Sequence, residues 1–439
     1  MIREKMGTDI LIPKSKIIDI KKYVSSAEYK FIRKVGKYAD DFGINAYLVG
    51  GFVRDLFLGE KNIDLDITVE GNGMEYTRFL AKKLGATYKC FEKFKTGKIF
   101  LKNRRSIDIT SARSEYYARP AALPDIKFTN LKYDLYRRDF TINAMAIQIN
   151  KKKTGNFIDP FNGYGDLKNK IIRALHSRSF MDDPTRILRA IRFEKRFDFR
   201  IENRTLEMLK SALNKDVFNK VPGERLRDEV LLMMKEQKTM DILKRGQNLG
   251  MLQKIHKGVK VKNKTKKSLN RINFYVNKPV FKNIDLDCVY FMIFFNALNI
   301  KDTGQIIARL KFKNNWKNKI INAKKYERSI LRRMKYKQNH KENLPALLCG
   351  FSREELFYFS LIYGKYFYEL ARRFLIKYKK IKLNVTGNDL KKIGIKQGPV
   401  YGKILKKIFY EKMSGKIKTK KQELKFVENY LQGGWHGHI

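Results

Sequence analysis

Residues 45–73, NAYLVGGFVRDLFLGEKNIDLDITVEGNG, constrain the fold more than any other part of this chain. Tyr47 to Val49 predict a short buried strand that runs directly into the pair Gly50 and Gly51. Glycine permits a tight turn and a close approach of the backbone to another group. The pattern then predicts an amphipathic helix from about Phe52. Because the N–H groups at a helix N-terminus have no partner within the helix, such a turn suits a phosphate.

Two aspartates follow on the next predicted strand, Ile63 to Val69. Side chains alternate along a strand, so Asp64 and Asp66 share one face. Adjacent carboxylates are unfavourable unless a cation lies between them. An isolated Asp-x-Asp is more often a solvated turn, but here it follows the glycine pair and Arg54 closely. The succession therefore predicts a divalent-metal site beside a phosphate cradle, which is the arrangement used for phosphoryl or nucleotidyl transfer.

The bulk properties indicate a soluble cytoplasmic protein with a polyanionic partner. The 439 residues suffice for two to four domains. The net charge of +51 favours nucleic acid, although a biased genome also enriches lysine. No run of about 18 apolar residues predicts a membrane span, and the N-terminal residues do not resemble a signal peptide. The three cysteines have no metal-ligand spacing and favour a reducing compartment: Cys90, Cys288 and Cys349.

Around this segment the pattern predicts further elements of a small mixed sheet with helices. Helices are expected at Ser26–Phe42 and 74–86, and strands within 87–101 and 106–113. Asp108 lies mid-strand, where it is either a third metal carboxylate or a sheet-edge residue. Residues 113–130 contain two prolines and no periodicity, so they predict a loop, and long loops are often functional.

A second motif, FMDDPTRILRAIRF at 180–193, points to base recognition. Pro184 suits the first position of a helix, which makes Asp183 a candidate N-cap. Asp183 and Arg186 are also three apart and can point the same way. One acceptor beside a fork of donors fits the amino group and ring nitrogens of cytosine and adenine, and not the edges of guanine or uracil.

The remaining chain is helical in pattern. In VPGERLRDEVLLMM, 221–234, Glu224, Arg225 and Glu229 predict bracing ion pairs without a chemical role. The aromatic stripe at 357–378 predicts core rather than a stacking surface for nucleotides. Near the C-terminus, Gly398–Pro399 predicts a helix start, and four lysines nearby predict contacts to RNA phosphates: Lys391, Lys392, Lys396 and Lys403.

Three motifs together resemble one family. LVGGFVRDLFLG with DLDI, then RRDFTINA at 137–144, then DDPTRILRAIRF are similar to the polymerase-beta-like nucleotidyltransferases, in the branch of the class II tRNA CCA-adding enzymes and bacterial poly(A) polymerases. In the last motif Asp182 replaces the usual glutamate. The resemblance is strong over 45–235 and moderate over 385–425.

The resemblance implies roles for individual residues. Two Mg²⁺ ions would be held by Asp64 and Asp66, with Asp108 as the additional acid. Asp183 and Arg186 would select the base. The other nucleotide-binding residues that it implies contact ribose or phosphate: Gly50, Gly51, Arg54, Arg138, Asp139, Asn143 and, for the triphosphate, Arg189.

The resemblance also implies an α/β head with a small mixed sheet, followed by an all-α neck, body and tail. We expect a basic arm at 1–24, a catalytic head at 25–150, a neck for nucleotide recognition at 151–235, a body at 236–380 and a tRNA-binding tail at 381–439. The implied function is addition of CMP and AMP from CTP and ATP to tRNA 3′ ends, with no protein partner. Rivals are an enzyme adding only A or only CC, a poly(A) polymerase, and an inactive RNA-binding module.

Overall fold

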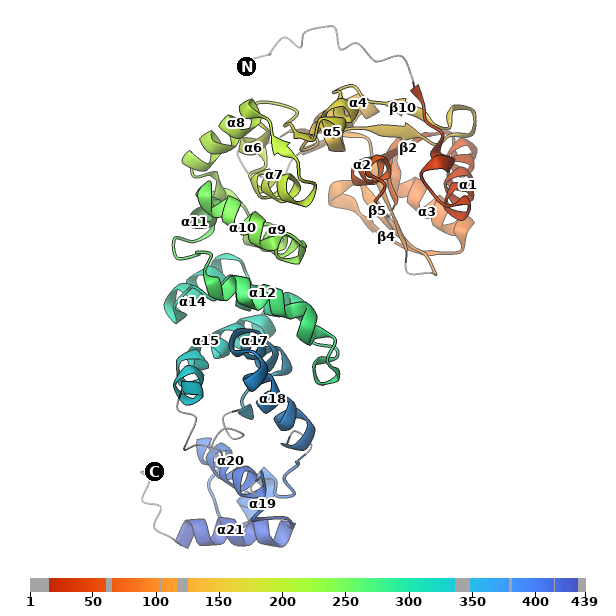
Figure 1. Cartoon of the computed structure of the whole chain (residues 1–439). Coiled ribbons are helices and arrows are strands. Elements are labelled where there is room, and N and C mark those ends of the chain that lie inside the picture. The colour runs from red at the N-terminus through yellow and green to blue at the C-terminus, as the bar shows by residue number, and fades with distance from the viewer. Residues whose placement is uncertain are drawn as a thin grey trace. The chain divides into compact units, whose positions relative to one another are not determined.

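The computed structural model describes residues 16–60, 65–102, 105–116, 125–335, 348–378, 381–413 and 415–432. The chain divides into two compact units, residues 1–255 and 256–439. The first is α/β and the second is helical (Figure 1). This confirms the expected fold class, a mixed-sheet head followed by helices. The finer domain boundaries stay a prediction, and the first compact unit runs past the expected neck end at 235.

The head is built on an eight-stranded mixed sheet of order β1-β10-β9-β2-β3-β6-β5-β4. Its central strands β3 and β6 are parallel, and the other pairs are antiparallel. The strands span Lys16–Ile17 (β1), Asn45–Val49 (β2), Leu65–Glu70 (β3), Thr87–Phe91 (β4), Thr96–Phe100 (β5), Ser106–Ser111 (β6), Ala146–Gln148 (β9) and Asn156–Ile158 (β10).

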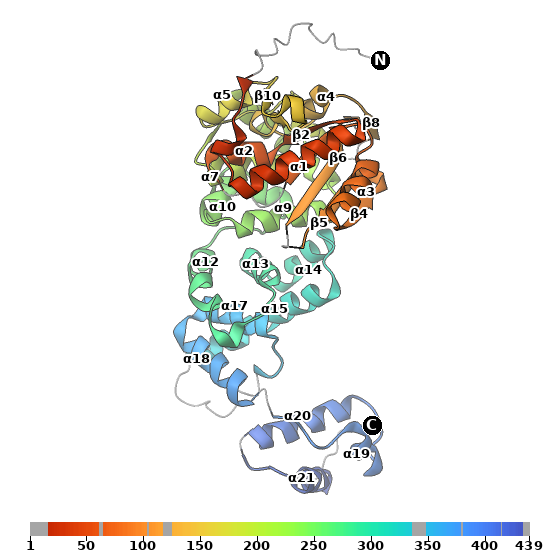
Figure 2. The same cartoon turned by 90° about the vertical axis from the view of Figure 1, so that its right-hand side faces the viewer.

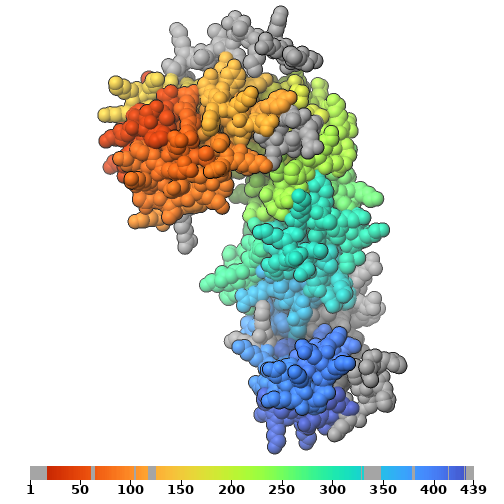
Figure 3. All heavy atoms as spheres, turned by 180° about the vertical axis from the view of Figure 1, so that it is seen from behind, coloured from red at the N-terminus to blue at the C-terminus, as the bar shows by residue number. Residues whose placement is uncertain are grey.

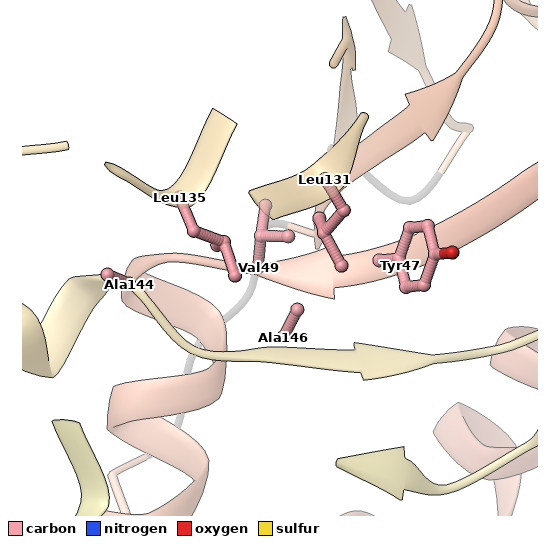
Figure 4. Close-up of a cluster of buried hydrophobic side chains, with 6 residues drawn as sticks. All are labelled: Tyr47, Val49, Leu131, Leu135, Ala144 and Ala146. Carbon is pink, nitrogen blue, oxygen red and sulfur yellow. The ribbon is translucent and has the colours of Figure 1, made fainter. Parts of the chain in front are cut away.

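Helices cover both faces of this sheet. Helices α1 (Ser26–Phe42) and α3 (Gly73–Leu84) pack side by side on one face (Figures 1 and 2). Helix α4 (Leu131–Tyr136) lies on the other face, where Leu131 and Leu135 contact Tyr47 and Val49 of β2 (Figure 4). Because side chains alternate, Asp66 and Thr68 of β3 face α4 as well. Viewed from behind, the head forms a rounded lobe, coloured red to yellow (Figure 3).

The predicted loop at 113–130 is wrong in its described part. Strands β7 (Arg113–Tyr116) and β8 (Asp125–Phe128) pair antiparallel, with Arg113 opposite Phe128. Four-residue strands are too short for an alternation pattern to be distinguished from an irregular segment. Residues 117–124, including both prolines, lie outside the described residues.

The neck follows as a series of helices in the first unit: α5 (Gly163–Lys168), α6 (Ser179–Asp182), α7 (Thr185–Arg196), α8 (Asn203–Asn214), α9 (Gly223–Lys235), α10 (Thr239–Asn248) and α11 (Met251–Ile255). A two-stranded parallel pair, β11 (Ile171–Ile172) and β12 (Arg200–Ile201), joins them. Helix α7 packs against α9 and α10, and its inward face is apolar.

The second unit contains α12 (Asn263–Val276), α13 (Leu286–Phe294), α14 (Ile300–Arg309), α15 (Asn314–Lys335), α17 (Arg353–Tyr363), α18 (Lys365–Arg373), α19 (Gly387–Lys392), α20 (Pro399–Met413) and α21 (Lys420–Gln432). The aromatic stripe at 357–378 is core, as predicted, since Phe357, Phe359 and Phe367 are fully buried. It forms two helices rather than one because Gly364 has a φ of 77°. Within the described stretches, no helix has the length and apolarity to cross a membrane.

Candidate active site

The glycine turn joins strand β2 to helix α2 (Gly51–Leu58). Gly50 has a φ of 67°, a conformation that L side chains rarely adopt. A Cβ atom at Gly50 would lie 2.7 Å from Nη1 of Arg138 and 4.0 Å from Oδ2 of Asp66. Glycine is therefore required here both for conformation and for space, and the turn lies against two of the predicted site residues.

Two of the predicted metal carboxylates lie on the central parallel strands. Asp66 of β3 is in register with Asp108 of β6, so both side chains leave the same face of the sheet. Nζ of Lys98 lies 2.9 Å from Oδ2 of Asp108, which is partly exposed. Asp64 lies outside the described residues. Within the described ranges, no three acidic, histidine or cysteine side chains form a metal cluster. Carboxylate oxygens on adjacent strands are nevertheless the donors that Mg²⁺ prefers, so the residues fit such an ion.

Arg138 is fixed beside the turn by a buried acid that the sequence motifs do not indicate. Asp134 of α4 is fully buried and accepts hydrogen bonds from Arg138 at 2.9 Å and from Arg137 at 2.6 Å. Burial alone would raise the pKa of Asp134, but the two guanidinium groups lower it below its usual value. Only its position four residues before Arg138, across the C-terminal end of α4, could have indicated this pairing.

Asp139 joins the head to helix α7 of the neck. Its Oδ1 accepts hydrogen bonds from Asn143 and from the Phe140 N–H, both at 2.8 Å. Its Oδ2 accepts two from Arg189, at 2.8 and 2.6 Å. Burial would raise the pKa of Asp139, but Arg189, the Asn143 amide and Arg186 together lower the pKa to about 2. Arg189 thus forms a bidentate pair between the head and the neck.

Arg54 is also buried at this junction. Its guanidinium lies over two aromatic rings at the C-terminal end of α7, with Cζ 5.2 Å from the centroid of Phe193 and 4.7 Å from that of Phe197. It donates hydrogen bonds to Asp55 at 2.8 Å and to Asn143 at 2.7 Å. Arg54 and Asn143 therefore position helix α2 and the Asp139 carboxylate, in addition to lining the cavity described below.

The predicted base-reading residues lie at the start of α7. Asp183 Oδ1 accepts hydrogen bonds from the Thr185 N–H at 3.1 Å and from its hydroxyl at 2.6 Å. The helix begins at Thr185, with Pro184 as the N-cap, so the prediction of Pro184 as its first residue is wrong by one position. Asp183 still satisfies a free N–H at the helix start, as a capping side chain does.

The other oxygen of Asp183 pairs with a residue for which the sequence predicts only a bracing role. Nη2 of Arg225, on α9, lies 2.8 Å from Asp183 Oδ2. Glu229, one turn further along α9, contacts Arg189 at 3.5 Å and Arg192 at 3.7 Å. Glu229 therefore braces the neck as predicted, whereas Arg225 orients the Asp183 carboxylate.

Arg186 is held by three neighbours of its own. Nη1 donates to the Ser179 hydroxyl at 2.7 Å and lies 3.4 Å from Nε2 of His176. Nη2 donates to the carbonyl oxygen of Arg137 at 2.6 Å. These contacts fix the direction of a guanidinium that is 5% exposed.

Most of the predicted site residues line one cavity of about 810 Å³. Nine arginines outnumber five acidic residues in its wall, which favours a polyanion such as a triphosphate. The predicted site residues that line it come from the head and the neck: Gly50, Gly51, Arg54, Asp66, Arg138, Asp139, Asn143, Asp183, Arg186 and Arg189. Asp108 is outside this lining but in register with Asp66.

The four predicted RNA-binding lysines lie in the second unit. Lys391 and Lys392 end helix α19, Lys396 follows it, and Lys403 is on α20. All four are exposed. Helix α20 begins at Pro399, as predicted.

One family model and several curated relatives match this chain. A family model described as the poly A polymerase head domain matches residues 46–173. An A-adding tRNA nucleotidyltransferase of Geobacter sulfurreducens is 34% identical over 90% of this chain. This chain spans only 46% of that longer relative. The A-adding tRNA nucleotidyltransferase of Halalkalibacterium halodurans is 30% identical over 94% of this chain and 96% of its own length. A CCA-adding enzyme of Lactobacillus helveticus is 36% identical over 44% of this chain and 47% of its own length.

Solved structures of CCA-adding enzymes are also similar to this chain. An apo form of a CCA-adding enzyme has a TM-score of 0.73 at 34% identity and covers 94% of this chain and 97% of its own. The Thermotoga maritima CCA-adding enzyme complexed with tRNA has a TM-score of 0.66 at 33% identity, with the same coverage. A CCA-adding enzyme in complex with ATP has a TM-score of 0.74 at 31% identity, and covers 95% of this chain and 99% of its own. The chain belongs to the tRNA nucleotidyltransferase family that contains the A-adding and CCA-adding enzymes.

Proposed function

We propose that this chain transfers nucleoside monophosphates from nucleoside triphosphates to the 3′-hydroxyl of tRNA, with AMP as the last nucleotide added. The observation that carries the proposal is the single cavity that combines Asp66, an arginine-rich wall and the pair Asp183 and Arg186. These are a metal-binding carboxylate, a triphosphate-binding surface and a base-selecting edge. The complexes of related enzymes with ATP and with tRNA support the same substrates here.

Divalent metal is the cofactor that this chemistry requires. Asp66 and Asp108, with Asp64, would hold two Mg²⁺ ions. When bound, they lower the pKa of the attacking hydroxyl and neutralise charge on the departing pyrophosphate. The protein itself contributes Arg138, which Asp134 holds at the glycine turn, where it can donate to phosphate oxygens. The free N–H groups at the start of α2 add donors without charge.

Base selection is assigned to Asp183 and Arg186. The carboxylate accepts from the amino group of cytosine or adenine, and the guanidinium donates to a ring nitrogen. Guanine and uracil place a carbonyl oxygen against the carboxylate, which leaves two acceptors facing each other. Arg225 supports this role because its 2.8 Å contact holds the carboxylate in one orientation.

Two specificities are compatible with this site. Addition of the full CCA sequence is the first candidate, because Asp183 and Arg186 accept both C and A, and because the CCA-adding structures cover 94–95% of the chain. Addition of A alone is the second. It is favoured by the A-adding relatives, which match over 90–94% of the chain, whereas the L. helveticus CCA-adding enzyme matches over 44%.

The test uses tRNA lacking its last one, two or three nucleotides, incubated with each triphosphate alone and with CTP plus ATP. Full restoration of all three substrates identifies a CCA-adding enzyme. Extension only of tRNA ending in CC identifies an A-adding enzyme, and extension that stops at CC identifies a CC-adding enzyme. Long A tracts on any RNA identify a poly(A) polymerase. Binding of tRNA without any incorporation would contradict the proposal.

A further inference from the structure

A second, smaller cavity of about 290 Å³ lies beside the first in the same unit. The two cavities share three wall residues, Glu115, Arg137 and Arg186. The rest of the second wall comes mainly from helix α4, with Tyr133 and Tyr136, and from the segment that leads into α6, with His176 and Arg178. Because the walls are shared, an RNA strand with one nucleotide in the first cavity can place its neighbour in the second.

Aromatic rings dominate the open side of this second cavity. Tyr133 is 41% exposed and Tyr136 is 37% exposed, although both belong to a helix whose other residues Leu131 and Leu135 are buried. The His176 ring lies 5.5 Å from the Tyr136 ring, centroid to centroid, at an angle of 38°. Flat rings at an open cavity next to a guanidinium are the usual means by which proteins hold unpaired RNA bases.

The charges of this wall favour a neutral ligand over a second triphosphate. Its three arginines face two acids, Glu115 and Asp182. Arg137 is ion-paired with Glu115 at 3.0 Å, and Arg178 with Asp182 at 3.3 Å. The first cavity has a clear excess of arginine, but this one is nearly balanced, which suits a neutral base.

The His176 ring is also uncharged at neutral pH. Burial, Arg186 and Arg178 lower the pKa of His176 to about 4. A neutral imidazole presents one donor and one acceptor, so it can hydrogen-bond a base edge as well as stack. Its Nε2 lies 3.4 Å from the Arg186 guanidinium, which links the two cavities through one residue.

We propose that this second cavity binds the base of the penultimate nucleotide of the RNA acceptor end, by stacking on Tyr136 and Tyr133. The inference rests on the proposed function, because it assumes that the 3′-terminal nucleotide is at the first cavity. It assigns the acceptor strand a base-holding site that is separate from the site for the incoming triphosphate. Arg178, exposed at the rim, contacts the phosphate of the same nucleotide.

The test is a double-mutant cycle between protein and RNA. The probe is a fluorescently labelled tRNA acceptor minihelix ending in CC, with either a cytosine or an abasic ribose at the penultimate position. Its affinity for the full chain is measured by anisotropy. We expect the abasic change to weaken binding roughly five- to 150-fold. Tyr136→Ala should weaken binding of the intact minihelix by a similar factor. The affinity of this variant should be almost the same for the intact and the abasic minihelix.

Two control variants isolate the stacking interaction. Tyr136→Phe keeps a ring and should retain the preference for the intact base. Tyr88→Ala removes a tyrosine of strand β4 that is 47% exposed and lines neither cavity. The abasic change should therefore weaken binding to this variant by the same factor as binding to the unmodified protein. If Tyr136→Ala fails to fold, Tyr133→Ala replaces it in the cycle.

A variant-free measurement completes the test. 2-Aminopurine at the penultimate position should lose fluorescence on binding, because stacking quenches it. The inference is overturned if the abasic penalty is the same in the unmodified protein and the alanine variant, or if 2-aminopurine remains bright in the complex. Nucleotide incorporation is scored separately. A stacking signal without any incorporation would contradict the proposed function and not the base-binding cavity.

Discussion

At the scale of single residues, Asp183 has two structural tasks as well as its proposed chemical one. One oxygen holds the start of α7 through Thr185, and the other pairs with Arg225. A carboxylate held on both sides has a defined direction, which base selection requires. The same contacts mean that a change at Asp183 affects stability and selectivity together, so the two must be measured side by side.

We expect Asp183→Asn to relax base selection. An amide caps a helix about as well as a carboxylate, but it can turn its NH₂ towards the base and accept a carbonyl such as uracil O4. Discrimination against UTP should fall roughly tenfold to a hundredfold. The measurement compares CTP, ATP and UTP incorporation alongside the melting temperature. Unchanged selectivity with an unchanged melting temperature would leave Asp183 as a capping residue only.

At the scale of elements, the tight turn between β2 and α2 brings Gly50 and Gly51 into the cavity wall. Gly50 and Gly59 begin and end helix α2, and their φ values are 67° and 70°. They differ in surroundings, since a Cβ at Gly59 would meet nothing within 4 Å, whereas one at Gly50 would lie 2.7 Å from Arg138. The pair therefore compares Gly59, a left-handed glycine in open surroundings, with Gly50, which lies beside Arg138 and has a ψ of −133° outside the left-handed region.

Gly59→Ala should lower the free energy of unfolding by about 1 kcal/mol and leave the incorporation rate of the folded protein unchanged. Gly50→Ala should lower the free energy of unfolding by more than Gly59→Ala does, because the ψ of −133° at Gly50 lies outside the left-handed region that an L residue can enter. It should in addition reduce incorporation roughly ten- to a hundredfold, because small misplacements of a positioned group such as Arg138 have effects of that size. Urea unfolding and single-turnover incorporation measure the two effects. Equal activity losses in both variants would contradict the role assigned to Arg138.

Head and neck are joined by the pair Asp139 and Arg189, and stability should depend on its ionisation. Asp139→Asn leaves the half-buried Arg189 without this carboxylate, so the free energy of unfolding should fall by about 2–3 kcal/mol. Because the pKa of Asp139 is lowered to about 2, its contribution is present above the unfolded pKa of about 4 and is lost as the pH falls towards 2.

The difference in free energy of unfolding between the unmodified protein and Asp139→Asn should therefore shrink as the pH falls through that window. Denaturant titrations at several pH values measure it. Asp241→Asn changes an exposed aspartate of α10 in the same unit and should shift stability by less than about 0.5 kcal/mol. A pH-independent difference would show that Asp139 is not ionised in the folded protein.

Much of the head could be predicted from the sequence, and the reasons are local. Helix α1 was expected at Ser26–Phe42 and has those bounds, because its apolar residues repeat at helical spacing. The predicted site residues that line the cavity lie within short motifs, whereas Phe94, Arg113 and Glu115, which also line it, do not. The role of Arg225 could not be predicted, since its partner Asp183 is set by how α7 and α9 pack. Asp134 was missed because it lies outside the motifs, although its arginine partners are only three and four residues away. The β7–β8 pairing was missed for a related reason, because four-residue strands carry too little pattern.

At the scale of the whole molecule, the charge of +51 predicts strongly salt-dependent binding of tRNA. Each phosphate that a lysine or arginine binds releases counterions, so log affinity should fall linearly with log salt. Changing Lys391, Lys392, Lys396 and Lys403 together to alanine should lower the slope by roughly one for each phosphate that the variant no longer binds. The control changes four exposed lysines of the first unit: Lys82, Lys83, Lys151 and Lys152. An unchanged slope in the first variant would place the RNA-binding surface elsewhere.

The most direct test of nucleotidyl transfer in this cavity is AMP incorporation into tRNA ending in CC, by the full chain and by Asp66→Ala. Asp66 is in register with Asp108 and lines the cavity beside Gly50, so its removal should abolish incorporation with Mg²⁺. Affinity for tRNA should stay nearly the same, because lysine and arginine side chains that bind phosphates supply most of it. Near-normal turnover by Asp66→Ala, with the variant folded and tRNA bound, would contradict nucleotidyl transfer at this site.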